Sequence, residues 1–323
     1  MKKKALITGI SGQDGAYLSK YLLENDYEVY GILRRNSVPE NQTVRLDDIY
    51  DQIKDNLIYA DLTDFSSLLR IVRLVNPDEI YNLAAQSHVQ VSFDLPLYTT
   101  ETIVNGTINL LEIIRLENRR IKYYQASSSE MFGNSIDSDG YQRESTPMIP
   151  VSPYGAAKLC AYHNVKVYRK SYNIFASNGI LFNHESPLRG TSFVTNKIAK
   201  GAVLIKKGLA KNLVLGNLSA SRDWGHAKDY TKAMHLILQT NNPDDFVCST
   251  GETHTVQEFC DIVFKKLNLD KKLILTNPKY MRPYELDVLK GDPTKLKTKT
   301  NWEPEYSFES MIDEMIKYWE EKL

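Results

Sequence analysis

The sequence has few cysteines, no excess of either charge and no long hydrophobic run. Its three cysteines, Cys160, Cys248 and Cys260, fit neither a disulfide framework nor a zinc site, so we expect a reducing compartment and no metal. Lysine plus arginine number 40, as do aspartate plus glutamate, which argues against nucleic acid or an anionic membrane as a partner. Because no apolar run approaches the roughly 18 residues of a membrane span, and the basic start resembles no signal peptide, we expect a cytoplasmic protein.

The length of 323 residues fits one large or two closely packed domains. Strand and helix patterns alternate through the first half, which predicts an α/β fold: a Rossmann-type doubly wound parallel sheet with a smaller C-terminal α+β domain. We place a dinucleotide-binding domain at 1–182 and a mainly substrate-binding domain at 183–323, some segments of which return to the first. Predicted strands span 4–8, 28–33, 57–60, 79–84, 121–126 and 176–181. Predicted helices span 65–74, 102–115, 153–172, 194–206, 228–238, 256–266 and 310–321.

A glycine turn links the first strand to an amphipathic helix. Gly9, Gly12 and Gly15 are spaced to allow a tight turn and a close approach of the backbone to a pyrophosphate. At the end of the second strand, where an acidic residue would bind the adenosine ribose of NAD, the chain has Arg34 and Arg35. An arginine there suits a 2′-phosphate, so NADP is favoured over NAD.

The residues that follow the next strands should lie at the same sheet edge, because ligands of such sheets bind beyond the carboxyl ends of the strands. Asp61 and Leu62 would flank the adenine. Leu83, Ala84, Ala85 and Ser87 would line the nicotinamide side of the cofactor.

A tyrosine and a lysine four residues apart begin the helix at 153–172. Ser152 and Pro153 are a favoured N-cap and first residue, which puts Tyr154 in the first turn and Lys158 on the same face. The lysine charge should lower the pKa of the phenol and make Tyr154 an acid/base near neutrality. Ser128 and Glu130 follow the fifth strand and could add proton chemistry that simple hydride transfer does not need.

The loops of the second half are rich in polar residues. Cationic groups that converge on one cleft would suit a diphosphate. The polar candidates in these loops are Asn183, Arg189, Lys197, Arg222, Arg282 and Glu285. His184 and His226 have no second ligand at metal spacing, so we assign neither to a metal.

Together these motifs resemble the extended short-chain dehydrogenase/reductases that act on nucleotide sugars, and within them the GDP-mannose 4,6-dehydratase group. The resemblance covers nearly the whole chain. It is carried by the glycine triplet, Tyr154 with Lys158, and the segments 34–37, 83–85, 125–130, 181–187, 222–230, 282–283 and 291–295.

The resemblance implies a dehydration. Tightly held NADP⁺ would oxidise the sugar at C4 while Tyr154, assisted by Lys158, removes the O4 proton. Glu130 would remove the C5 proton and help the C6 hydroxyl leave as water, with Ser128 bonded near O4. Return of hydride to C6 would complete the reaction.

The resemblance also implies ligand contacts. By the glycine-turn motif and the family pattern, NADP contacts are Gly9, Ser11, Gly12, Gln13, Asp14, Gly15, Arg34, Arg35, Asp61, Leu62, Leu83, Ala84, Ala85, Ser87, Tyr98, Tyr154, Lys158, His184 and Arg189. GDP-sugar contacts are Ser87, Ser128, Glu130, Tyr154, Asn183, Lys197, Arg222, Arg282 and Glu285.

Three departures from the family pattern leave questions open. Ser128 stands where the family usually has threonine, and the segment 134–143 is longer than usual, so GDP-mannose, GDP-N-acetylglucosamine and GDP-heptoses all remain candidate substrates. The arginine-rich loop at 35–45, which reaches a neighbouring subunit in tetramers of the family, is shorter here. We therefore expect a homo-oligomer, either dimer or tetramer.

Two other interpretations of the sequence compete with that of a dehydratase. A 4-epimerase or 4-reductase shares Tyr154 and Lys158 but commonly has a small or apolar residue in place of Glu130, so Glu130 favours dehydration. A non-catalytic NADP-binding protein usually lacks the tyrosine or the lysine, and both are present.

Overall fold

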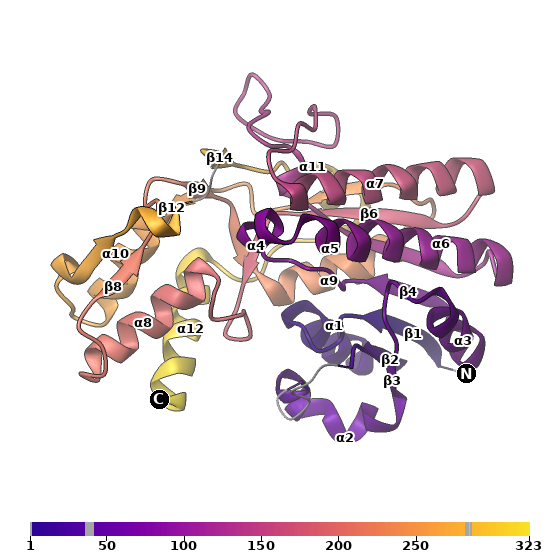
Figure 1. Cartoon of the computed structure of the whole chain (residues 1–323), viewed down its shortest axis with the longest axis horizontal. Helices are drawn as coiled ribbons and strands as arrows, with labels where there is room; N and C mark the ends of the chain where they lie inside the picture. Colours follow the sequence, from indigo (N-terminus) through magenta and orange to yellow (C-terminus); the bar gives the residue numbers. More distant parts are fainter. Residues whose placement is uncertain (1, 36–41, 282–283, 285) are drawn as a thin grey trace.

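A seven-stranded parallel sheet forms the centre of the molecule (Figure 1). The computed structural model describes residues 2–35, 42–281, 284 and 286–323. The strand order is β11-β6-β5-β4-β1-β2-β3, so the chain winds outward from β1 in both directions, as the sequence predicts. The fold is thus the expected Rossmann-type α/β sheet with small additional sheets formed by the second half.

The strands of the main sheet are β1 Lys3–Thr8, β2 Tyr27–Leu33, β3 Leu57–Tyr59, β4 Glu79–Asn82, β5 Lys122–Ser128, β6 Ala176–Leu181 and β11 Asp245–Cys248. The small sheets contain β7 Asn183–Glu185, β8 Leu213–Leu215, β9 Ser221–Arg222, β10 Trp224–His226, β12 His254–Thr255, β13 Ile274–Thr276 and β14 Val288–Leu289.

The α-helices are α1 Gln13–Glu24, α2 Tyr50–Ile53, α3 Phe65–Val75, α4 Val89–Asp94, α5 Pro96–Thr100, α6 Gly106–Glu117, α7 Pro153–Tyr172, α8 Val194–Lys206, α9 Ala227–Leu238, α10 Val256–Lys266, α11 Thr294–Thr300 and α12 Phe308–Lys322. Short 3₁₀ turns are η2 Val44–Ile49, η3 Lys54–Asn56, η5 Ser129–Met131, η6 Lys271–Leu273 and η7 Pro278–Tyr280, and η4 Glu101–Asn105 is a π-helical turn between α5 and α6.

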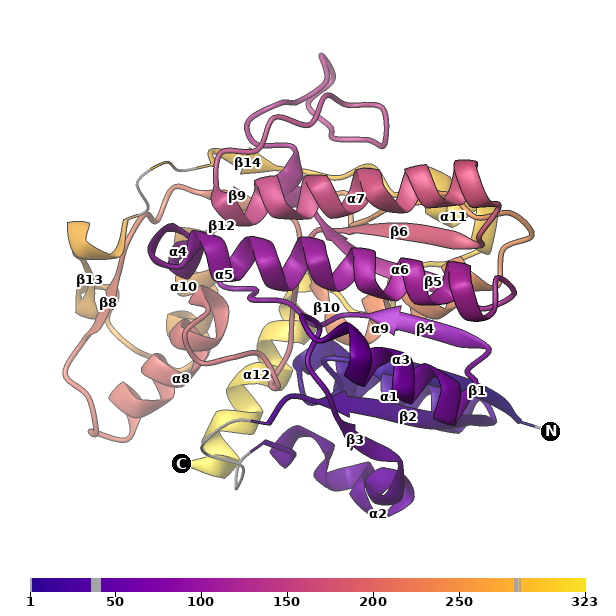
Figure 2. The same cartoon turned by 45° about the vertical axis from the view of Figure 1, so that its right-hand side comes forward.

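Helices cover both faces of the sheet, as its nearly continuous apolar strands require. On one face α3, α6 and α7 pack side by side, and on the other α1 packs against α9 (Figure 2). Separate clusters of buried side chains fill the two layers: one includes Leu68 and Ile114, the other Leu18 and Ile237.

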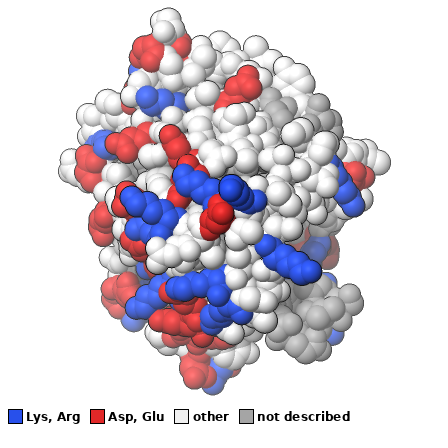
Figure 3. All heavy atoms as spheres, turned by 90° about the vertical axis from the view of Figure 1, so that its left-hand side faces the viewer, with Lys and Arg blue, Asp and Glu red and all other residues white. Residues whose placement is uncertain are grey.

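The second half builds its own core beside the carboxyl edge of the sheet. Helices α8, α10 and α12 enclose an apolar cluster that includes Phe259 and Met315. The chain also returns to the main sheet, because β11 pairs with β6 and α9 packs on β5 and β6. Basic and acidic side chains are interspersed on the face shown in Figure 3. No described helix is long and apolar enough to cross a membrane.

Candidate active site

A cavity of about 630 Å³ lies at the carboxyl edge of the sheet, between the sheet and the second half. Its volume is within the range of small-molecule sites. Thirteen predicted site residues line it: Asp14, Leu83, Ala85, Ser87, Ser128, Glu130, Tyr154, Lys158, Asn183, His184, Arg189, Lys197 and Arg222. The structure therefore brings the candidate catalytic groups and most of the candidate substrate contacts into one space.

Helix α7 starts at the cavity, and its first turn carries Tyr154. The Ser152 hydroxyl accepts a hydrogen bond from the Gly155 amide at 3.0 Å, and Pro153 occupies the first helical position. The predicted N-cap is therefore present, and it fixes the start of the helix next to the cavity. The amide of Tyr154 donates to the Ser92 hydroxyl at 3.2 Å, which ties this turn to α4.

Lys158 lies one turn further along α7 and is buried. Its ammonium donates to the Ala126 carbonyl at 2.7 Å and lies 5.7 Å from the centre of the Tyr154 ring. Burial lowers the pKa of Lys158 to about 8. Lys158 thus joins α7 to β5 and remains mostly protonated at neutral pH.

The pKa of Tyr154 corrects one expectation. Burial raises it to about 12, the hydrogen bond with Ser128 lowers it, and the charge of Glu130 raises it. The prediction that Lys158 lowers this pKa below the ordinary tyrosine value is wrong for the protein alone, because the desolvation of the phenol outweighs the favourable contacts.

Ser128 and Glu130 lie where β5 runs into the short turn η5. The Ser128 hydroxyl caps this turn by accepting a hydrogen bond from the Glu130 amide at 3.2 Å. Only 8% of Glu130 is exposed, so it is not a surface acid. A Cβ on Gly155 would come within 2.7 Å of the Glu130 carbonyl oxygen. Glycine at this position thus allows α7 to pack directly against the segment that carries Glu130.

The glycine turn has the geometry of a phosphate-binding loop. Gly9 has a φ of +71°, and a Cβ there would lie 2.9 Å from backbone atoms of Ala84. The N-cap of α1 is Gly12, which has no side chain to cap the first amides. Those amides and the helix dipole are suited to an anion, so the turn fits a pyrophosphate.

The first two residues of α1 are held by β7 and by Ser186, which follows it. Gln13 is buried, donates to the His184 carbonyl at 3.1 Å and accepts from the Ser186 hydroxyl at 2.7 Å. The Asp14 carboxylate lies 2.8 Å from Nε2 of His184. Although burial opposes both charges, the mutual attraction and hydrogen bond lower the pKa of Asp14 to about 2 and raise that of His184.

The adenosine end of the predicted cofactor site is more open. Arg34 and Arg35 are exposed just beyond β2, and the Arg34 guanidinium donates to the Tyr98 hydroxyl from α5. Asp61 accepts bonds from the amide and hydroxyl of Thr63 at 2.9 Å. Leu62 is 6% exposed and packs in the core, so its side chain is less available than the sequence suggests.

The opposite wall carries the candidate contacts to a diphosphate. Arg222 is buried and donates to the Ser221 carbonyl at 2.8 Å. Burial lowers the pKa of Lys197, whose ammonium lies 4.1 Å from the centre of the Tyr280 ring. Arg189 pairs with Glu185 at 3.2 Å. Predicted contacts Arg282 and Glu285 lie outside the described residues.

Our sequence reasoning missed an aromatic part of the wall. His88, Phe193, Trp224 and Tyr280 line the cavity, and the Arg189 guanidinium lies 3.8 Å from the centre of the Phe193 ring. His88 follows the fourth strand closely, so the rule that selected Ser87 could have found it. The other three come from the second half, where no regular alternation indicated which loops face the sheet.

The long segment 134–143 does not line the cavity. It projects from the body between β5 and α7 (Figure 1). Arg143 holds it in place through ion pairs with Asp137, Asp139 and Asp292 at 2.7–3.0 Å. Its extra length therefore gives no reason to expect an altered sugar pocket. Among the described residues, no cluster of three or more metal-ligating side chains occurs.

Residues 6–315 match the family model described as GDP-mannose 4,6 dehydratase. The chain belongs to this family. It is 48% identical to GDP-mannose 4,6 dehydratase 1 of Arabidopsis thaliana, over 98% of this chain and 89% of the relative. It is 47% identical to GDP-mannose 4,6 dehydratase of Homo sapiens, over 97% and 90%.

Solved structures show the same fold at lower sequence identity. The UDP-glucose 4-epimerase of Thermotoga maritima, solved with UDP-glucose, superimposes with a TM-score of 0.86 at 22% identity, over 99% of each chain. The predicted family and fold class are thus confirmed for this member of the GDP-mannose 4,6-dehydratase family.

Proposed function

We propose that this enzyme converts GDP-mannose to GDP-4-keto-6-deoxymannose by removal of one water molecule. Family membership supports the reaction and the substrate. The structural observation that carries the proposal is the meeting of two different acid/base groups, Tyr154 and Glu130, in one cavity. Oxidation of the C4 hydroxyl to a ketone needs only an acid/base such as Tyr154. Elimination of water across C5 and C6 also needs a base such as Glu130.

We propose NADP as the cofactor. The open first turn of α1 and the close contact of Gly9 with Ala84 fit a pyrophosphate, and the exposed arginines beyond β2 suit a 2′-phosphate. NADP⁺ bound there would supply the hydride acceptor for C4 and, once reduced, the donor for C6.

Tyr154 would take the proton from O4 as the sugar is oxidised. Its buried phenol bonds to Ser128, which can also hold the sugar oxygen in line. Lys158 lies close enough for its charge to favour the phenolate as the proton leaves, even though burial dominates in the protein alone.

Glu130 would perform the elimination. Once C4 carries a ketone, the proton on C5 becomes acidic, and a nearby carboxylate can remove it. The same group, now protonated, can give a proton to the departing C6 hydroxyl. One C–H bond and one C–O bond break, a C5–C6 double bond forms, and water leaves.

The GDP moiety would lie along the opposite wall. Lys197 and Arg222 face the cavity beside Asn183 and provide positive charge for the diphosphate. Arg282 and Glu285 remain predicted contacts. We also propose a homo-oligomer, dimer or tetramer, which sedimentation velocity can measure.

Mass spectrometry of product formation tests the proposal. Purified protein is incubated with GDP-mannose and, in parallel, GDP-N-acetylglucosamine, and we expect loss of one water from GDP-mannose. The Glu130→Gln variant should lose this activity by on the order of 10³-fold. Glu144→Gln is the matched control, because Glu144 is a partly buried acid that accepts a bond from the Val247 amide at 2.8 Å outside the cavity. Equal activity of the two variants would rule out the assigned base.

A further inference from the structure

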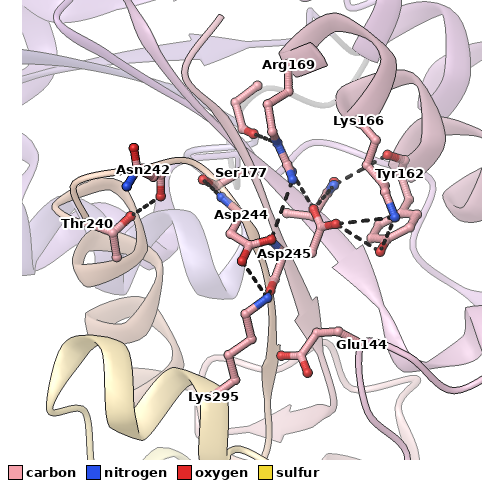
Figure 4. Close-up of polar contacts among 12 residues, drawn as sticks. Glu144, Tyr162, Lys166, Arg169, Ser177, Thr240, Asn242, Asp244, Asp245 and Lys295 are labelled. Carbon is pink, nitrogen blue, oxygen red and sulfur yellow. Dashed lines mark hydrogen bonds and ion pairs between the residues drawn. The ribbon is translucent and has the colours of Figure 1, made fainter. Parts of the chain in front are cut away.

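A buried carboxylate in β11 connects the two elements that carry the candidate catalytic residues. Asp245 is 5% exposed, and its carboxylate lies beside Tyr162 and Arg169 of α7 (Figure 4). It accepts hydrogen bonds from the Tyr162 hydroxyl at 3.0 Å and from the Asn178 amide group at 2.8 Å, and it pairs with Arg169. A carboxylate that is this well bonded has little freedom to move.

The chain of bonds continues to the end of β5. The Ser127 hydroxyl donates to the Asn178 side-chain oxygen at 3.1 Å, and Asn178 in turn donates to Asp245. Ser127 and Asn178 are 3% and 0% exposed, so water cannot easily replace either bond. Ser127 immediately precedes Ser128 and is three residues before Glu130.

At its other end the hydrogen-bond network reaches α7. Lys158, Tyr162 and Arg169 are separated by four and seven residues and therefore share one face of the helix. Lys158 donates to the Ala126 carbonyl of β5 at 2.7 Å, which joins α7 to β5 directly. Tyr162 donates to Asp245, which joins α7 to the next residue of β5 through β11 and β6. The first turn of this helix carries Tyr154.

We infer that Asp245 and Asn178 are positioning residues that set the distance between Tyr154 on α7 and Ser128 with Glu130 after β5. They would touch neither substrate nor cofactor, since neither lines the cavity. This inference rests on the proposed function, because it assigns the network to the geometry of that reaction. Small errors in the placement of reacting groups are costly to rate.

Two serine variants test the inference. Ser127→Ala removes the buried bond to Asn178, whereas Ser177→Ala removes a partly buried bond, the one accepted from the Asp244 amide at 3.2 Å (Figure 4). Both serines are buried, but only Ser127 belongs to the network. Ser127 also lines the cavity, so the inference further requires a lower kcat for Tyr162→Phe, which changes a network residue outside the cavity. We expect about a tenfold lower kcat with unchanged KM for Ser127→Ala, and no change in either constant for Ser177→Ala. Similar losses of thermal stability in the two variants would exclude a general loss of folding as the cause.

A double-mutant cycle gives a second measure. Tyr162→Phe removes the other end of the network and should also lower kcat. If the network acts as one unit, the double variant Ser127→Ala with Tyr162→Phe should lower kcat little more than the stronger single variant. Independent, multiplying effects on kcat would overturn the inference, as would equal kcat values for Ser127→Ala and Ser177→Ala.

Hydrogen exchange keeps this test separate from the proposed function. In the protein without substrate, Ser127→Ala should speed amide exchange in both 123–132 and 153–160, whereas Ser177→Ala should leave these segments unchanged. If wild-type protein fails to dehydrate GDP-mannose but the two variants show this exchange pattern, the function is wrong and the network stands. Unchanged exchange in Ser127→Ala would overturn the network itself.

Discussion

The two ends of the central sheet both bury polar groups but treat them differently. At the amino end, Glu79 is 1% exposed and accepts bonds from Lys3, Tyr27, Tyr81 and Gln239 at 2.7–3.3 Å. At the carboxyl end, burial raises the pKa of Tyr154 to about 12 and lowers that of Lys158 to about 8.

The difference separates structural from reactive polar groups. Four donors surround one carboxylate at the amino end, so the charge there is compensated and has no room for a ligand. At the carboxyl end burial shifts the pKa values of Tyr154 and Lys158 toward their neutral forms, so the charged forms are less stable there than in water and a reacting ligand can change the balance. Changes at the carboxyl end should therefore affect turnover, and changes at the amino end should affect stability.

The largest effect should come from Tyr154→Phe. Loss of the acid/base should reduce kcat by on the order of 10³-fold and change stability little, since the ring remains. Tyr81→Phe is the matched control, because it removes a buried hydroxyl that donates to Glu79 at 2.7 Å. Steady-state kinetics with GDP-mannose measure both, and substantial turnover by Tyr154→Phe would refute its assigned role.

Glu79→Ala should have the opposite effect, a loss of stability without a loss of turnover. Its removal leaves the buried Tyr81 hydroxyl without an acceptor and takes one acceptor from Lys3, Tyr27 and Gln239, which should cost about 3 kcal/mol of the free energy of unfolding. Turnover of the folded protein should stay the same. Urea unfolding measures the loss, with Glu117→Gln, which weakens an exposed pair with Arg73, as the control. A variant as stable as wild type would contradict the structural role assigned to the amino end of the sheet.

The Asp14–His184 pair sharpens the comparison, since it lies at the carboxyl end but is fully partnered. The pKa of Asp14 falls from 3.8 to about 2, so its stabilisation is present above about pH 4 and is lost as the pH falls through 2. The pKa of His184 is raised above 6.5, so its stabilisation is present below pH 6.5 and is lost as the pH rises through the folded-state value.

Asp14→Asn should remove both contributions and cost about 2 kcal/mol near pH 6. The stability of the variant should depend less on pH in both ranges, which urea unfolding at a series of pH values measures. Stability curves that run parallel for variant and wild type would show that the pair does not act as an ion pair.

The smallest effect should come from the helix caps. Ser152→Ala and Ser307→Ala each remove an N-cap bond, of 3.0 Å at α7 and 3.1 Å at α12, and should each cost about 1 kcal/mol. Only Ser152 positions the turn that carries Tyr154, so only its variant should also lower kcat. Thermal unfolding and kinetics on both variants decide this, and equal kcat values would count against a link between cap and site.

Local patterns predicted much of the fold because they reflect local causes. The serine and proline at 152–153 predicted the start of α7, and apolar periodicity predicted α8 and α10 with their observed bounds. Strand β11 was missed, because four residues carry too weak a pattern and their pairing with β6 depends on a distant part of the chain.

The candidate site shows the same limit. The rule that ligands lie beyond strand ends selected Ser128 and Glu130, which the structure places on the cavity. The spacing of Tyr154 and Lys158 predicted their proximity, but not that burial would dominate the pKa of Tyr154. Burial depends on how the second half covers the sheet edge, which no local pattern encodes.

The place of β11 also bears on the order of events during synthesis. Translation produces β1 to β6 well before Asp245–Cys248, so β6 remains an open edge while the residues between them leave the ribosome. An unpaired edge strand can join other chains. The nascent protein therefore passes through a stage at which most of its sheet exists but is unprotected, and chaperones that shield strand edges should matter most at that stage.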